Sequence, residues 1–159
     1  YPPCFAVYIE LKGFKLQRYS FLVALRIWHP NIDPAIITGN LGMKPKHTAQ
    51  AGQSRATPQG RLLGGTYAES HWAADPFDRG EYLSTDDVAE DALAAVVEAL
   101  APSKAFLLLL REQGARVHLQ VSSFSGKNYA IELSPKFLLL CAELGISVVH
   151  DVYPYAQNW

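Results

Sequence analysis

The alternation of apolar and polar residues predicts a sheet strand followed by a short capped helix near the start of the chain. Residues 21–28 are apolar at almost every position, which is typical of a strand at the centre of a sheet. Asp33 then stands as a helix N-cap, with Pro34 at the first helical position, where a missing N–H costs nothing. Gly42 supplies the left-handed residue that ends such a helix.

The next stretch, Lys44–Gly65, shows neither a strand nor a helix period and is rich in Gly, Gln, Thr, Ser and Pro. A loop of this length inside a small domain is either functional or mobile. It leads into a predicted strand over residues 66–72. Alternation within that strand puts Tyr67 and His71 on one face and Trp72 on the other.

The second half of the chain predicts further helices and strands. They are a helix from the capping pair Ser84–Asp87 to about Ala101, a hairpin of Lys104–Arg111 and Arg116–Ser123, a strand over Tyr129–Leu133, a helix opened by Ser134-Pro135, and a final strand over Ile146–Tyr153. Together these elements predict an α+β fold with a largely antiparallel sheet of about six strands and three helices. The order strand, cap, Pro, helix, Leu-Gly occurs in 25–42 and again in 130–145, which suggests an internal pseudo-duplication.

Composition is that of an ordinary folded domain. The 159 residues suit one α+β domain over 21–159, preceded by an N-terminal arm or peripheral strand over 1–20. Hydrophobic residues make up 49% and charged residues 18%, which excludes a disordered chain, and a net charge of -1 argues against nucleic acid as a partner. No apolar run reaches the length of about 18 residues that a membrane span needs. The two cysteines fit no disulfide framework, so a cytoplasmic location is expected.

Several short motifs together resemble a known family. They are Ala24–Ile27, His29-Pro30, Ile32–Pro34, Ile37-Thr38, Leu41-Gly42, Pro45, Gly52–Gly60, the set Tyr67, Ser70 and Trp72, and the endings Leu144–Ile146 and Asp151–Tyr153. From Phe21 to about Tyr153 this combination resembles a bacterial family catalogued as domain of unknown function 4279. That family carries no established activity, so the resemblance implies domain boundaries and no particular function.

A cationic loop is the first candidate for chemistry, because no acidic residue occurs between Asp33 and Glu69. Its cations are Lys44, Lys46, Arg55 and Arg61, which His47 could join. Glycine lets backbone N–H groups approach an anion, and Arg offers a bidentate fork, so the loop is a candidate site for phosphate or carboxylate. A solvated basic loop, or an Arg55 side chain that binds helix carbonyls, explains the same residues without a ligand.

Aromatic and imidazole side chains gather on two of the predicted strands. They are Trp28, His29, Tyr67, His71 and Trp72. If the two strands share a sheet, these side chains could line a binding cleft. Packing within the sheet is the commoner role for such residues, above all for Trp. The candidate ligand-binding residues are Arg55, Arg61, Tyr67, His71, Trp72 and His29.

The sequence predicts no catalytic residue, metal site or cofactor, since it has no nucleophile elbow and no metal-ligand spacing. The favoured hypothesis is a non-catalytic binding module that recognises a protein or an anionic ligand through residues 44–65 and the adjoining sheet face. One alternative is an enzyme or small-ligand binder with Arg55, His71 and Tyr67 in one cleft. The other is a structural protein that forms homo-oligomers through its N-terminal arm and its aromatic tail.

Overall fold

A computed structural model describes residues 18–154 and contains a six-stranded sheet and a separate two-stranded hairpin. The sheet strands are β1 (Ser20–His29), β2 (His47–Ala49), β5 (Ser70–Ala74), β6 (Tyr82–Leu83), β7 (Arg116–Phe124) and β8 (Ser147–Tyr153), and the hairpin strands are β3 (Ser54–Ala56) and β4 (Leu62–Thr66). The helices are α2 (Pro34–Leu41), α3 (Ala89–Leu100), α4 (Lys104–Glu112) and α5 (Pro135–Glu143), with a 3-10 turn η1 (Ala101–Ser103) between α3 and α4. The predicted α+β fold is confirmed, while the predicted N-terminal arm lies outside the described residues except for its end, residues 18–20.

Strand β1 lies in the middle of the sheet, as its apolar sequence predicts. The strand order is β2-β5-β1-β7-β8, and the short β6 pairs with the start of β1. Every neighbouring pair is antiparallel except β7 and β8. These two strands run parallel because the chain returns between them through a long crossover that contains α5.

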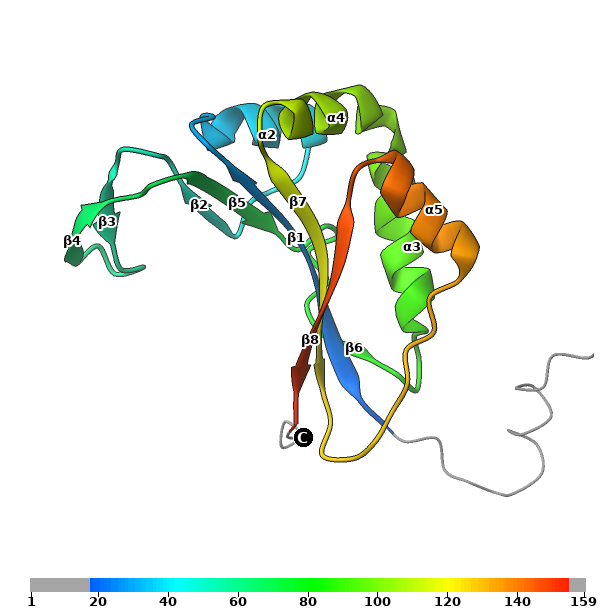
Figure 1. Ribbon diagram of the computed structural model, residues 1–159. Helices are drawn as coiled ribbons and strands as arrows, with labels where there is room; N and C mark the ends of the chain where they lie inside the picture. The colour runs from blue at the N-terminus through cyan, green and yellow to red at the C-terminus, as the bar shows by residue number, and fades with distance from the viewer. Residues whose placement is uncertain (1–17, 155–159) are drawn as a thin grey trace, which may run out of the picture.

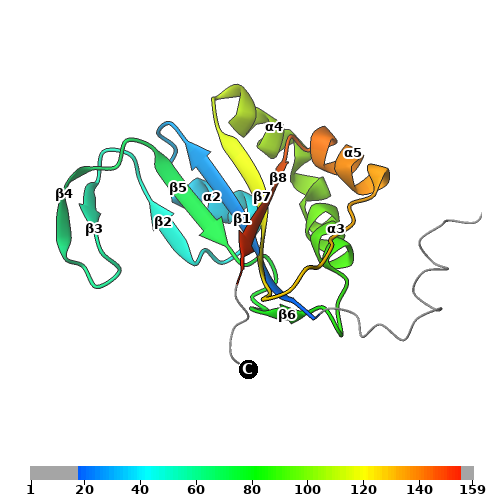
Figure 2. The ribbon, with the colours of Figure 1, turned by 60° about the horizontal axis from the view of Figure 1, so that its bottom comes forward.

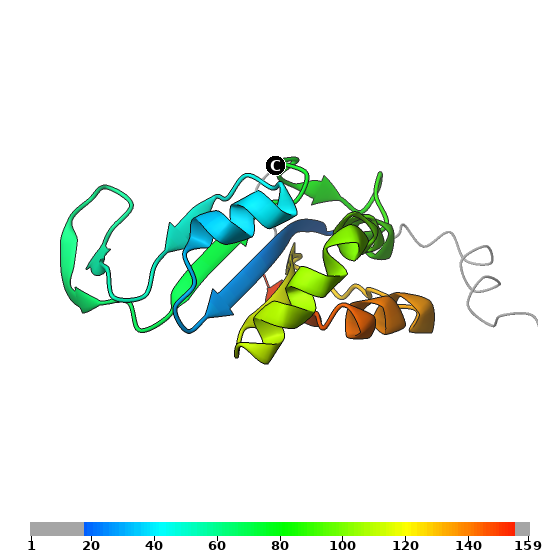
Figure 3. The same cartoon turned by 90° about the horizontal axis from the view of Figure 1, so that it is seen from above.

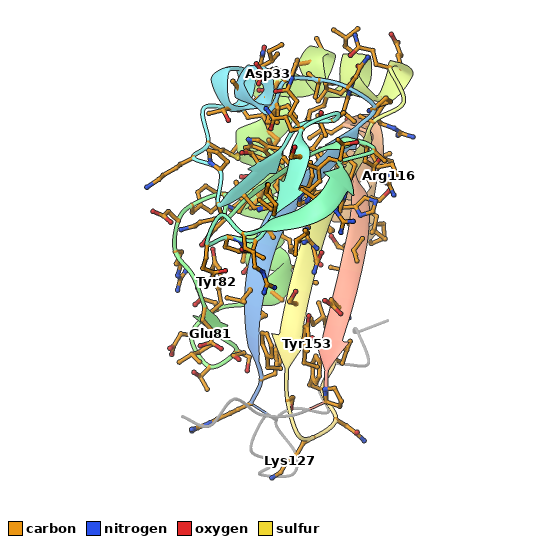
Figure 4. All side chains as sticks on the ribbon, turned by 90° about the vertical axis from the view of Figure 1, so that its left-hand side faces the viewer. Asp33, Glu81, Tyr82, Arg116, Lys127 and Tyr153 are labelled. Carbon is orange, nitrogen blue, oxygen red and sulfur yellow. The ribbon has the colours of Figure 1, made fainter. Side chains whose placement is uncertain are left out.

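The helices of the described chain all lie on one face of this sheet (Figure 1, Figure 2). Helix α2 packs on β5, α3 on β1, α4 on β7 and α5 on β8. Every second residue of β1 and β7 points towards this layer, and Leu25, Ile27 and Leu119 are fully buried there. Seen from above, α2 and α4 lie over the strands (Figure 3), whereas in Figure 4 the strands β1, β7 and β8 face the viewer with the helices behind and above them, so the other face of the sheet is uncovered by helices. The core therefore occupies one side of the sheet only.

Both predicted cap-plus-proline devices are confirmed. The Asp33 carboxylate accepts a hydrogen bond of 2.8 Å from the N–H of Ala35 at the start of α2. Gly42, at a φ of +65°, ends this helix in the left-handed conformation, and its N–H donates to the carbonyl of Thr38. At α5 the Ser134 hydroxyl accepts from the N–H of Phe137 at 3.3 Å.

The prediction of a strand over residues 104–111 is wrong, because this segment forms helix α4. The six consecutive apolar residues Ala105–Leu110 carry no visible period, so the sequence alone fits a strand or a helix. In the structure Leu107 and Leu110, three residues apart, are buried, whereas Leu109 is 48% exposed. The glycine interpreted as a hairpin turn, Gly114, has a φ of +93° and caps the helix instead, with its N–H bonded to the carbonyl of Arg111.

Two further predictions are wrong in detail. Residues 129–133 form no strand and belong to the loop that leads into α5, so the proposed duplication lacks its second strand. Helix α3 begins at Ala89 without a side-chain cap. The expected capping carboxylate, Asp87, binds the guanidinium of Arg79 instead, with contacts of 3.0 and 2.6 Å.

The predicted loop over residues 44–65 contains short strands. Strand β2 joins the main sheet beside β5, and β3 pairs with β4 to form the hairpin. The predicted strand over 66–72 is divided, since β4 ends at Thr66 and β5 starts at Ser70. Within β5 the predicted alternation holds, with Trp72 buried on the helix side and His71 on the other face.

Helix α3, η1 and α4 form one continuous helical segment of 24 residues, Ala89–Glu112. By length and composition it is apolar enough to cross a membrane, with a mean hydropathy of 1.8. The sequence pattern did not show it because Pro102 and several charged residues interrupt the apolar run. In the fold the buried side chains of this segment belong to the core; they are Ala89, Leu93, Val96, Val97, Leu100, Leu107 and Leu110.

The helical register of α4 predicts unequal costs for two neighbouring truncations. We expect Leu107→Ala to lower the free energy of unfolding by about 2–5 kcal/mol, because it leaves a cavity in the core. Leu109→Ala should change it by less than about 0.5 kcal/mol. Urea denaturation measures both. Similar losses in the two variants would contradict the helix, because residues 107 and 109 would share a face only in a strand.

Candidate binding face

The face of the sheet that the helices leave uncovered carries a group of cations and rings. Trp28 of β1 lies opposite His71 of β5 on one side and Arg116 of β7 on the other. Two residues back along β1, on the same face, Arg26 lies opposite His118 of β7. We call Arg26, Trp28, His47, His71, Arg116 and His118 the open-face cluster.

The indole of Trp28 is the centre of the open-face cluster. The rings of His71 and His118 each lie 4.9 Å from it, centroid to centroid. The guanidinium carbons of Arg26 and Arg116 lie 5.5 and 5.1 Å from the indole centroid, within the range of cation–π attraction. The negative face of the indole therefore helps to hold two like charges on one small surface.

His71 is a strongly perturbed group of this face. Burial, followed by the nearby charges of His47 and Arg26, lowers the pKa of His71 from its usual 6.5 to about 4. The His47 ring lies 5.2 Å away. The Nε2 atom of His71 is buried and has no hydrogen-bond partner among the described residues. Such an unpaired buried atom is uncommon in folded proteins.

The positive charge of the open-face cluster at neutral pH comes from its arginines. Burial lowers the pKa of His118 as well, followed by the charges of Arg116 and Arg26, so this ring is neutral. Arg116 is paired with Glu69 at 2.6 Å in an exposed ion pair. Arg26 has no carboxylate partner among residues 18–154, and its Nη1 donates to the amide oxygen of Gln120 at 2.9 Å. A guanidinium is thus left available to an external anion.

A line of hydrogen-bonded polar side chains continues the open face towards the other end of β7 and β8. The amide nitrogen of Gln120 donates to the Ser122 hydroxyl at 3.0 Å and to the Asp151 carboxylate at 3.3 Å. The Tyr153 hydroxyl donates to the same carboxylate at 2.9 Å. Arg116 and Tyr153 mark the two ends of this surface (Figure 4). The face is therefore polar along its whole length, with its cations at one end.

Hairpin β3–β4 stands away from the sheet on the open-face side (Figure 1, Figure 4). Its strands pack on each other and make few contacts with other elements. All five residues of β4 are exposed, and Leu62 and Leu63 are 71% and 49% exposed. Arg55 and Arg61 are also exposed and have no acidic partner among the described residues. The hairpin therefore presents apolar and cationic side chains together.

The structure separates the six candidate residues into three places. Arg55, Arg61 and Tyr67 belong to the hairpin and its base, where the Tyr67 hydroxyl donates to the carbonyl of Ala56 at 3.5 Å. His71 lies in the open-face cluster. Trp72 and His29 lie on the helix side of the sheet and are buried.

Trp72 and His29 are held by bonds within the fold. The Trp72 indole N–H donates to the Thr38 hydroxyl of α2 at 3.0 Å. The Nδ1 atom of His29 accepts from the N–H groups of Asn31 and Ile32 at 3.1 and 3.0 Å, so Nε2 carries the proton and donates to Gln113 at 3.0 Å. Their hydrogen-bonding capacity is used, and their burial leaves no surface for a ligand.

Sequence reasoning missed Arg26, Arg116 and His118 as members of one surface. A signal was present in the second half of the chain, where polar residues alternate with Val117, Leu119 and Val121 along a single strand. That pattern predicts a polar face. It does not say which residue of β1 lies opposite, and this pairing brings Arg116 to Trp28.

The histidines of the cluster do not form a metal site. Within the described part of the chain, no three His, Cys, Asp or Glu side chains converge as metal ligands. Two guanidiniums beside these rings also repel a cation and attract an anion. This face therefore attracts negative charge rather than a metal cation.

The chain matches a family described as Domain of unknown function (DUF4279) over residues 17–155. This match confirms the resemblance carried by the sequence motifs. No curated protein matches the chain, and no solved structure matches it. The geometry of the open face is thus the basis for assigning a role.

The lowered pKa of His71 predicts how stability depends on pH. The folded pKa of about 4 lies below the usual histidine value of 6.5, so the unfolded chain binds more protons between these values. The free energy of unfolding should therefore fall as the pH drops from 6.5 towards 4 and should not depend on His71 above that window. We expect His71→Gln to lose less stability than the natural chain between pH 7 and pH 4.5, measured by urea denaturation. Equal losses would contradict this assignment.

Proposed function

We propose that this member of the domain of unknown function 4279 family is a non-catalytic binding protein. Its open face recognises an acidic segment of a partner protein. The observation that carries the proposal is the open-face cluster, where two guanidiniums and the imidazoles of His71 and His118 surround Trp28 on a sheet face that the described helices leave uncovered. As part of the same proposal, the protein works in a bacterial cytoplasm.

The chemistry of the cluster favours carboxylates. Hydrogen bonds between a guanidinium and a carboxylate are about twice as strong as neutral ones, and Arg26 has no carboxylate partner among the described residues. A carboxylate bound near His71 would also favour the protonated form of its ring. A flat face with a polar line along β7 and β8 suits an extended peptide better than a globular ligand.

The hairpin supports a protein partner over a small anion. An isolated two-stranded hairpin is marginally stable in water, so one that packs on little else gains from a partner that covers it. Its exposed Leu62 and Leu63 provide an apolar contact, and Arg55 and Arg61 favour an acidic one. A small anion would need neither the leucines nor the length of the polar face.

The two alternative functions receive less support. The enzyme hypothesis needs Arg55, His71 and Tyr67 in one cleft, but the Tyr67 hydroxyl binds a backbone carbonyl and the His71 ring packs against Trp28 and His47. The oligomer hypothesis places its contacts in the N-terminal arm and the aromatic tail. Residues 1–17 and 155–159 lie outside the described residues, so that hypothesis stays a prediction.

A labelled synthetic peptide of alternating Glu and Val residues tests the proposal by fluorescence anisotropy at low salt. We expect binding to the natural chain, and a Kd at least about tenfold higher for the double variant Arg26→Gln, Arg116→Gln, because each charged hydrogen bond is worth about 1.5–3 kcal/mol. Added salt should weaken binding.

The matched control removes a cation from the helix layer. Lys136→Gln on the exposed surface of α5 changes the net charge in the same direction without touching the open face. We expect it to leave the Kd within about twofold of the natural value. The proposal fails if the natural chain does not bind the peptide, or if the double variant binds as tightly as the Lys136 variant while both stay folded by circular dichroism.

A further inference from the structure

A second polar group lies on the helix side of the sheet, away from the open face. Ser123 of β7 is fully buried, and its hydroxyl is hydrogen-bonded to both Tyr129 and His150. The distance from the Ser123 Oγ to the His150 Nε2 is 2.7 Å, and the Tyr129 hydroxyl lies 3.3 Å from the same nitrogen. The three side chains come from β7, from the loop after it and from β8.

The hydrogen bonds of this group can form a chain of donors that runs from Tyr129 through Ser123 to His150. Burial lowers the pKa of His150, so its ring is neutral at pH 7 and its Nε2 can accept a proton. With the His150 proton on Nδ1, the nearer hydroxyl, that of Ser123, donates to Nε2, and the Tyr129 hydroxyl donates to the Ser123 oxygen. This order gives Tyr129 a path for its proton through Ser123 to His150.

Of the two hydroxyls in this group, that of Tyr129 is the one that a ligand can reach. It lines a cavity of about 440 Å³, together with His150, Ile131 and Val152. Ser123 is fully buried and lines neither this cavity nor a second one of about 590 Å³ on the Tyr19 side of the Tyr129 ring, so its own oxygen is closed to a ligand. The phenol ring is held in place by stacking on Tyr19 at 4.7 Å.

The cavity suits a small uncharged compound. Apart from His150, its ionisable side chains are Tyr129 itself and Lys127, and the Lys127 side chain extends away from the sheet (Figure 4). Ile131 and Val152 supply an apolar wall beside the hydroxyl. An apolar body with a polar reacting group, such as a small ester, matches this lining.

We propose that Tyr129 is an activated nucleophile that accepts an acyl group from a small uncharged ester bound in this cavity. The Tyr129 oxygen attacks the carbonyl carbon of the ester, a new C–O bond forms, and the bond to the alcohol portion breaks. The alcohol leaves as its anion, the Tyr129 proton moves to Ser123, and the Ser123 proton moves to the Nε2 atom of His150. The products are an ester of Tyr129, the released alcohol anion and an imidazolium that returns its proton to solvent.

A purely structural role would also explain the hydrogen bonds, since a buried hydroxyl needs a partner. The two roles differ in reactivity. A general base commonly accelerates a reaction by about 10²–10⁴-fold, so an activated phenol reacts much faster than an ordinary one. Tyr67 serves as the internal reference, because its hydroxyl donates to a backbone carbonyl and has no base beside it in the structure.

4-Nitrophenyl acetate provides the test on the full chain at pH 7, with release of 4-nitrophenolate followed by absorbance and the acetylated residue located by mass spectrometry. We expect Tyr129 to be acetylated at least about tenfold faster than Tyr67. His150→Gln, a change at an exposed position, should slow acetylation of Tyr129 by about tenfold or more and leave Tyr67 unchanged. Tyr129→Phe should remove the fast release of 4-nitrophenolate that accompanies acetylation of Tyr129.

Two results would overturn the proposal. One is acetylation of Tyr129 no faster than that of Tyr67. The other is a Tyr129 rate that His150→Gln does not alter in a protein whose circular dichroism is unchanged. Ser123→Ala provides a second measure of the proton path, and it should slow the same reaction if the variant folds. If that variant does not fold, the His150 variant alone decides.

Discussion

The one-sided burial of the central sheet is the constraint on which the rest of the structure depends. The helices of the described chain pack against a single face, so alternate residues of β1 and β7 meet two different environments. Phe21, Leu25 and Ile27 are completely buried on the helix side. If the opposite, exposed face of the sheet were equally apolar, it would be an aggregation-prone surface. It carries Arg26 and other polar side chains instead.

This constraint also explains the electrostatics of the open face. Side chains on adjacent strands stand close together on one face, so the register that serves the core also fixes which polar groups meet. It brings His71, Trp28 and Arg116 into one row. The imidazoles of His71 and His118 stay neutral because burial and neighbouring guanidiniums lower their pKa values. A surface built in this way holds positive charge that an acidic partner can neutralise, beside a hairpin with exposed leucines.

Local chemistry made part of this structure predictable. The caps at Asp33 and Ser134 depend on residues adjacent in sequence, and the opposite faces of His71 and Trp72 follow from alternation alone. The α4 segment was mistaken for a strand because an unbroken apolar run fits both structures, and tertiary packing chose between them. The open-face cluster was not predictable as a set, because it depends on the pairing of β1 with a strand about ninety residues away.

The most direct test of the central claim follows the indole N–H signals of the ¹⁵N-labelled chain by NMR while the Glu-Val peptide is added. Trp28 lies in the open-face cluster, whereas Trp72 donates its indole N–H to Thr38 inside the core, so the two rings report on opposite faces of the sheet. If the peptide binds the open face, the indole N–H signal of Trp28 should shift while that of Trp72 stays in place. The Trp28 signal is identified by its absence from the spectrum of the Trp28→Phe variant. A bound peptide that leaves Trp28 unshifted, or that shifts amides of α3 and α5 instead, would contradict binding at the open face.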